Sequence, residues 1–138
     1  MFFVNSARYE YAREAYEEAF NATEKILLSN IKVEAGEKEL IVNFNDAIKR
    51  GWKHFDNAVI CCLRLLNKLG AENIVLAGFD GFKTKYNESY CDSSLPSLNA
   101  EGKWEELNME IRDMFQDFVE STKGKIEISF LTDSIYNV

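Results

Sequence analysis

The chain has few of the residues that mark secreted or metal-dependent proteins. Its 138 residues contain one histidine, one proline and three cysteines. Cys61 and Cys62 are adjacent in an apolar segment, which argues against a disulfide framework and indicates buried thiols in a reducing compartment. A lone histidine without neighbouring ligands does not make a zinc site. We therefore expect a cytoplasmic protein with no cofactor and no metal bound to this chain.

Basic charge and long apolar runs are also scarce. Lys and Arg number 16 against 23 Asp and Glu, so the net charge is -7. Nucleic acids and anionic membranes bind basic surfaces, so neither is an expected partner. The longest apolar run, 58–66, is interrupted by Arg64 and is shorter than the ~20 residues that span a bilayer. The first residues lack the pattern of a signal peptide.

Glycine-rich phosphate loops are missing as well. The seven glycines form neither a G-x-G-x-x-G nor a Walker pattern. The sequence also opens on an apolar, strand-like segment at 2–4, with no βα unit ahead of it to supply such a loop. We interpret this as the mark of a piece of a longer protein, and the alternative is a fold without a phosphate loop.

What the sequence does contain is a strong α/β pattern. Residues 56–82 predict a capped, almost wholly apolar helix, a turn at Gly70, a buried strand at 74–77 and a polar corner with Gly78 and Asp80. An apolar helix that leads into an apolar strand is typical of parallel sheets covered on both faces. We therefore expect an α/β protein.

The rest of the chain predicts one domain, 1–138, with a three-layer α/β/α Rossmann-like sandwich and a mostly parallel sheet of about five strands. Periodicity places the strands at 2–4, 25–28, 40–44, 74–77 and 126–130 and the helices near 6–20, 57–70 and 104–124. Residues 83–102 have no usable periodicity and predict a long loop, which in compact domains is often a binding loop or lid.

Polar residues follow the predicted ends of several strands. Because open α/β sheets bind ligands outside the carboxyl ends of their strands, these residues predict a crevice. The candidate ligand-binding residues are Asn5, Ser6, Arg8, Ser29, Asn30, Asn57, Gly78, Asp80, Asn87 and Tyr90. Asp80 would accept hydrogen bonds from a sugar hydroxyl, and Ser6, as a helix N-cap, would favour an anion. The alternative is that these residues only cap helices and close turns.

The reactive residue types are interpreted as structural. His54 lies beside Trp52 and Phe55 and has no Cys or carboxylate at ligand spacing, so we expect a packing or surface residue. Apolar neighbours around Cys61 and Cys62 would not lower a thiol pKa. No catalytic residue is therefore assigned to this chain.

Five short motifs, taken in order, resemble one protein family. They are Phe-Val-Asn-Ser-Ala-Arg-Tyr at 3–9, Leu-Leu-Ser-Asn-Ile at 27–31, Asp-Asn-Ala at 56–58, Leu-Ala-Gly-Phe-Asp-Gly-Phe at 76–82 and Phe-Leu-Thr-Asp-Ser-Ile-Tyr at 130–136. The set is similar to the C-terminal, Rossmann-like domain of bacterial aldolase-type proteins. There it follows a barrel similar to 4-hydroxy-2-oxovalerate and hydroxymethylglutaryl-type aldolases.

The resemblance implies an accessory role for this chain. Lyase chemistry and a divalent metal would belong to the barrel, which would be a partner in the same polypeptide. The chain itself would bind a nucleotide or phosphorylated sugar at the strand ends, would not be catalytic alone, and could form a homo-oligomer.

Two other functions stay open. The helix–turn–strand–Gly-x-Asp pattern also resembles bacterial sialyltransferases, which bind a cytidine nucleotide sugar on a similar sheet. Those enzymes use a histidine in the loop after that strand, and residues 83–102 contain none. The third function is a purely structural docking or dimerisation domain, which a large exposed apolar patch would favour.

Overall fold

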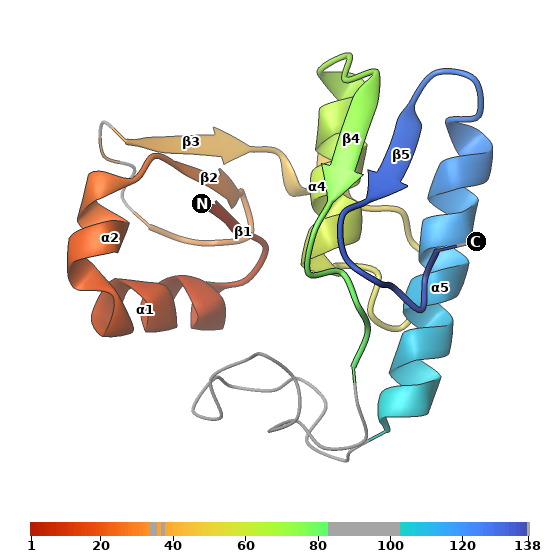
Figure 1. Cartoon of the computed structure of the whole chain (residues 1–138). Helices are drawn as coiled ribbons and strands as arrows, with labels where there is room; N and C mark the ends of the chain where they lie inside the picture. The colour runs from red at the N-terminus through yellow and green to blue at the C-terminus, as the bar shows by residue number, and fades with distance from the viewer. Residues whose placement is uncertain (34–35, 37, 83–102, 138) are drawn as a thin grey trace.

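In the part of the chain that the structure describes, five strands pair in parallel and form two sheets (Figure 1). The computed structural model describes residues 1–33, 36, 38–82 and 103–137. Sheet A has the order β1-β2-β3, with β1 at Phe2–Phe3, β2 at Lys25–Leu28 and β3 at Glu39–Val42. Sheet B pairs β4 (Asn73–Leu76) with β5 (Glu127–Phe130).

The predicted α/β class is confirmed, but the strands do not form one continuous sheet. Within the described ranges each strand pairs only with its neighbour in sequence, and β1 does not pair with β4. The described chain therefore has a break where one sheet of about five strands was expected.

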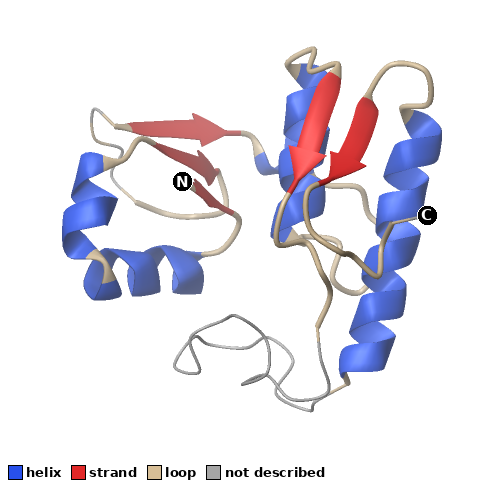
Figure 2. Cartoon of the chain, in the orientation of Figure 1, coloured by secondary structure: helices blue, strands red, loops and turns tan. Residues whose placement is uncertain are grey.

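Among the residues described, five helices accompany the strands (Figure 2). They are α1 (Ser6–Ala15), α2 (Glu17–Ala22), α3 (Phe44–Ala47), α4 (Ala58–Lys68) and α5 (Trp104–Ser121). The single helix expected near 6–20 is interrupted at Tyr16, whose φ of -132° and ψ of 42° are not helical. None of the helices in these described ranges is long and apolar enough to cross a membrane.

Sheet A is covered on both faces, as its alternating side chains require. On one face Phe3 and Leu27 pack with Tyr9 of α1 and Phe20 of α2. On the other face Val4 and Leu28 pack with Ala47 of α3 and Cys61 of α4. Sheet A is thus the middle of three layers.

The described helices cover sheet B on one face only. The main core packs Ile74 of β4 with Ile60 and Leu63 of α4 and with Ile111 and Phe115 of α5. Ile128 and Phe130 of β5 pack against the same core. On the other face Val75 is 65% exposed. Because α4 contributes to the cores of both sheets, it is the element that joins them.

The two helices that pack on sheet B, α4 and α5, are each joined to the following strand by a similar turn. Gly70 ends α4 with φ 82°, and Gly124 follows α5 with φ 77°. Each glycine lies three residues before its strand, and Asn73 pairs with Glu127 in register. A left-handed backbone after a helix is inexpensive only for glycine, so Gly70 stops α4 as predicted. The helix predicted to run to Gly124 ends earlier, at Ser121, with Thr122 as its C-cap.

Candidate functional site

The carboxyl ends of β4 and β5 meet in a hydrogen-bonded corner, which we call the Asp80 corner (residues 78–82 and 132–136). The Thr132 hydroxyl donates to Oδ1 of Asp80 at 2.7 Å and accepts from the Gly78 N–H at 2.9 Å. The Ile135 N–H donates to the Asp80 carbonyl at 3.2 Å. Gly78 has φ 72° and Gly81 φ 103°, so the chain turns sharply on both sides of Asp80.

The side chain of Asn108 on α5 is hydrogen-bonded to both chain segments of this corner. Its Oδ1 accepts from the Phe82 N–H at 2.9 Å, and its Nδ2 donates to the Phe82 carbonyl at 2.7 Å. The same Oδ1 accepts from the Tyr136 hydroxyl at 2.7 Å. Burial raises the pKa of Tyr136, so this hydroxyl keeps its proton and donates. One amide therefore fastens both chain segments of the corner to α5.

The arrangement leaves Asp80 with unused hydrogen-bonding capacity. Its side chain is half-buried, and Thr132 bonds only Oδ1. Within residues 1–33, 36, 38–82 and 103–137 no group is hydrogen-bonded to Oδ2. An ionised carboxylate can accept several hydrogen bonds, so a fixed Asp80 could accept from ligand hydroxyls.

The predicted residues of sheet A bond mainly to their own backbone. Asn5, not Ser6, is the N-cap of α1, because its Oδ1 accepts from the Arg8 N–H at 2.9 Å. The prediction for Ser6 was therefore wrong by one residue. Asn30 Nδ2 donates to the Val4 carbonyl at 2.8 Å, and Ser29 Oγ accepts from Phe44 N–H at 3.0 Å. These contacts favour the structural interpretation.

Three of the remaining candidate residues, Asn57, Asn87 and Tyr90, are not shown to line a site either. Asn57 caps α4, since its Oδ1 accepts from the backbone N–H of Val59 at 3.1 Å and of Ile60 at 3.2 Å. Asn87 and Tyr90 lie outside the described residues. In the part of the chain that the structure describes, no hydrogen bond joins the sheet A group to the Asp80 corner, so of the predicted residues Gly78 and Asp80 form the local site.

A histidine–carboxylate pair that sequence reasoning missed joins the segment between α3 and α4 to α5. His54 Nδ1 is 2.6 Å from Glu110 Oε2, and the His54 N–H donates to Glu110 Oε1 at 3.0 Å. Burial by itself would raise the pKa of Glu110, but the bonds from His54 outweigh it and hold that pKa below its ordinary value. The partners are 56 residues apart in sequence, so no local spacing could reveal them.

Glu110→Gln tests this pair as a source of pH-dependent stability. A carboxyl whose folded pKa is depressed stabilises the fold above its unfolded pKa, near 4.5, and loses that contribution as the pH falls through the folded value. We expect the variant to lose about 1 kcal/mol at pH 7, a typical value for one charged hydrogen bond in a partly exposed site. Urea unfolding from pH 7 to pH 3 should show the two proteins converge, and a constant difference would contradict the assignment.

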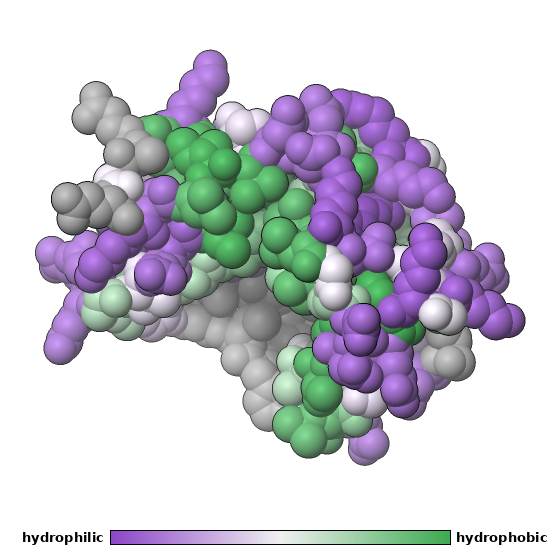
Figure 3. Space-filling view, turned by 90° about the horizontal axis from the view of Figure 1, so that it is seen from above, coloured by the Kyte–Doolittle hydropathy of each residue, from purple (hydrophilic) through white to green (hydrophobic). Residues whose placement is uncertain are grey.

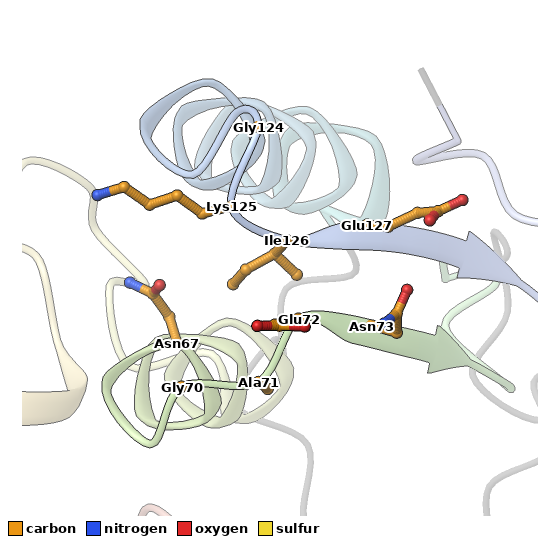
Figure 4. A pocket seen from close by; sticks show the side chains of 9 residues that line it. All are labelled: Asn67, Gly70, Ala71, Glu72, Asn73, Gly124, Lys125, Ile126 and Glu127. Carbon is orange, nitrogen blue, oxygen red and sulfur yellow. The ribbon is translucent and has the colours of Figure 1, made fainter.

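A hollow lies at the other end of sheet B, beside the amino ends of β4 and β5. It has a volume of about 720 Å³ and is bounded by the turns at Gly70 and Gly124. In Figure 4 the Lys125 and Glu127 side chains point away from each other, and Ile126 lies between them. Polar groups in a binding site converge on the ligand, so we favour the Asp80 corner despite this hollow.

Metal ligands and known relatives give no further guide to the site. Among the described residues there is no group of three or more His, Cys, Asp and Glu side chains that could hold a metal ion. Comparison with family models, curated proteins and solved structures finds no match to this chain. The functional argument therefore depends on the geometry of the corner.

Proposed function

We propose that this chain is an accessory, Rossmann-like domain of a larger aldolase-type enzyme. In this proposal it binds a nucleotide or phosphorylated sugar at the carboxyl edge of its strands and has no catalytic activity alone. The observation that carries the proposal is the Asp80 carboxylate, which Thr132 orients at the end of β4. The strand-end position is where open α/β sheets place their ligands.

The helix geometry supports an anionic group on the ligand. α4 is joined to β4 by the turn at Gly70, so α4 begins toward the carboxyl edge of sheet B. α1 begins directly after the carboxyl end of β1. The N-terminus of a helix presents free N–H groups and the positive end of its dipole, which favour phosphate. A sugar hydroxyl on Asp80 and a phosphate near these helix ends would suit the proposed ligand class.

Thermal-shift and calorimetric titrations with cytidine monophosphate, UDP-glucose and ribose 5-phosphate test the proposal. We expect at least one of them to raise the melting temperature, because a ligand that binds only the folded state stabilises it. Asp80→Ala should lower the affinity for that ligand by about tenfold or more, the effect of one lost charged hydrogen bond.

Two matched variants make the test specific. Thr132→Val removes the hydroxyl that orients Asp80 and should weaken binding less than Asp80→Ala does. Asp133→Asn changes an exposed acid in the same corner and should leave binding unchanged. No shift with any of the three ligands, or an unchanged affinity in Asp80→Ala, would refute the proposed site.

A further inference from the structure

Among the described residues, the two strands that border the break between the sheets, β1 and β4, each have an edge without a partner. β1 is the end strand of sheet A, and β4 pairs only with β5. Within the described residues, the edge of β1 away from β2 and the edge of β4 away from β5 are therefore both unpaired. An open edge carries a row of free N–H and C=O groups and is a template for another strand.

The strands of the two sheets are oriented as members of one twisted sheet. All three pairings are parallel. In Figure 1 the strand arrows turn progressively in one sense from β3 through β2 and β1 to β4 and β5. Adjacent strands in a sheet turn by a fixed hand in the same way. The break between β1 and β4 is thus consistent with one absent parallel strand.

An apolar stripe on α4 faces this break. Cys61 and Leu65 pack in the core of sheet A, whereas Val59 and Leu66 pack in the core of sheet B. Between these two faces, at helical spacing, lie Ala58, Cys62 and Leu69, and none of the three belongs to a core. Leu69 is 80% exposed.

The surface agrees with this placement. Figure 3 shows the molecule hollowed between the sheet A side and the sheet B side, with hydrophobic residues on both sides of the hollow. We call the space between β1 and β4, above the α4 stripe, the interstrand gap. Its rim offers hydrogen bonds and its floor is apolar, the combination that an extended apolar peptide needs.

The handedness of the connections also predicts on which face of the sheet the helix after such a strand would lie. α1 and α2 lie on one face, and α4 and α5 on the other, as right-handed crossovers in opposite directions require. A right-handed crossover from a strand in the gap into β1 would place its helix on the face of α1 and α2. On that face Val75 of sheet B is exposed.

We propose that the interstrand gap is the seat of a sixth, parallel β-strand supplied by a polypeptide segment outside residues 1–138. The completed order would be β3-β2-β1-inserted strand-β4-β5. The inserted strand is apolar on the side that meets α4, and the helix that follows it covers Val75. This proposal does not depend on a ligand at the Asp80 corner.

Disulfide tethering to Cys62 tests the proposal on the chain as it stands. The Cys91→Ser variant leaves Cys62 as the accessible thiol, because Cys61 is fully buried and its burial raises its pKa to about 12. The probe is the peptide acetyl-Glu-Val-Ile-Cys-Val-Ile-Lys-amide, and the control peptide has proline in place of both isoleucines. Proline removes backbone donors and cannot occupy a central strand.

We expect release of the strand peptide from Cys62 to need a concentration of 2-mercaptoethanol about tenfold higher than release of the proline peptide needs. Hydrogen exchange should slow in both β1 and β4 of the tethered protein, because both edges gain a partner. Leu69→Lys should abolish the difference, since that substitution puts a charge on the exposed floor. Leu40→Lys, an exposed position on β3, should leave it unchanged.

Three results would overturn the proposal. They are equal retention of the two peptides, slowed exchange in only one of the two strands, and no effect of Leu69→Lys. A dimer of the free chain that protects β1 and β4 by itself would identify a second copy as the occupant and would also contradict the proposal.

Discussion

Asn108→Ala is expected to lower the free energy of unfolding by about 3 kcal/mol, because it removes three hydrogen bonds at about 1 kcal/mol each. The amide of Asn108 bonds both backbone groups of Phe82 and the hydroxyl of Tyr136. Tyr136 is 1% exposed, so its hydroxyl cannot turn to solvent when the amide is removed. Urea unfolding monitored by fluorescence measures the loss, which should lower the melting temperature by about 10 °C for a domain of this size.

Two variants separate the parts of this effect. Tyr136→Phe removes one of the three bonds and should cost about 1 kcal/mol. Asn108→Asp keeps the acceptor for Phe82 and Tyr136 but loses the donor to the Phe82 carbonyl, so it should lie between the other two. If Asn108→Ala costs no more than Tyr136→Phe, the amide does not fasten the corner to α5 as described.

The local elements of this fold could be predicted from the sequence because short-range patterns specify them. The strand at 25–28 coincides with β2, and the capped helix predicted before Gly70 is present as α4. Each depends on residues within one turn or one strand. The shift of the first cap from Ser6 to Asn5 shows the limit, because both residue types cap helices well.

Contacts between distant segments could not be predicted. Asn108 and Tyr136 lie 28 residues apart, and nothing in the pattern around either residue indicates the other. Lys25 is a clearer case, because the sequence places a cation in a strand that is otherwise apolar. In the structure it is 3% exposed, and its Nζ lies 3.4 Å from Oε1 of Glu39 on the neighbouring strand β3. The pairing of β2 with β3 brings this counter-charge to Lys25.

The candidate site was predicted in part for the same reason. The Gly78–Asp80 turn is a local feature, and its position after a buried strand marked it correctly as a corner. Thr132, which orients Asp80, lies 52 residues away and was not identified. The break between β1 and β4 was also not foreseen, because strand order depends on edge pairing rather than on the periodicity of any one strand.

Gly81→Ala is expected to destabilise the protein by about 2 kcal/mol, more than the same change at Gly78. Both glycines have left-handed φ, 103° at Gly81 and 72° at Gly78, which costs an alanine about 1–2 kcal/mol. A Cβ at Gly81 would also clash with Cδ1 of Ile135, whereas a Cβ at Gly78 meets nothing within 4 Å. Gly78→Ala therefore serves as the matched control for backbone strain alone.

The Ile135→Ala background separates the steric part from the backbone part. Ile135 is 45% exposed, so its truncation should itself cost little, and it removes both atoms that crowd the new methyl group. In that background we expect Gly81→Ala to cost no more than Gly78→Ala does, as measured by urea unfolding. Because close neighbours couple when they share a contact, a purely additive double variant would show that Ile135 does not restrict this position. Gly81 would then be required for its backbone conformation alone.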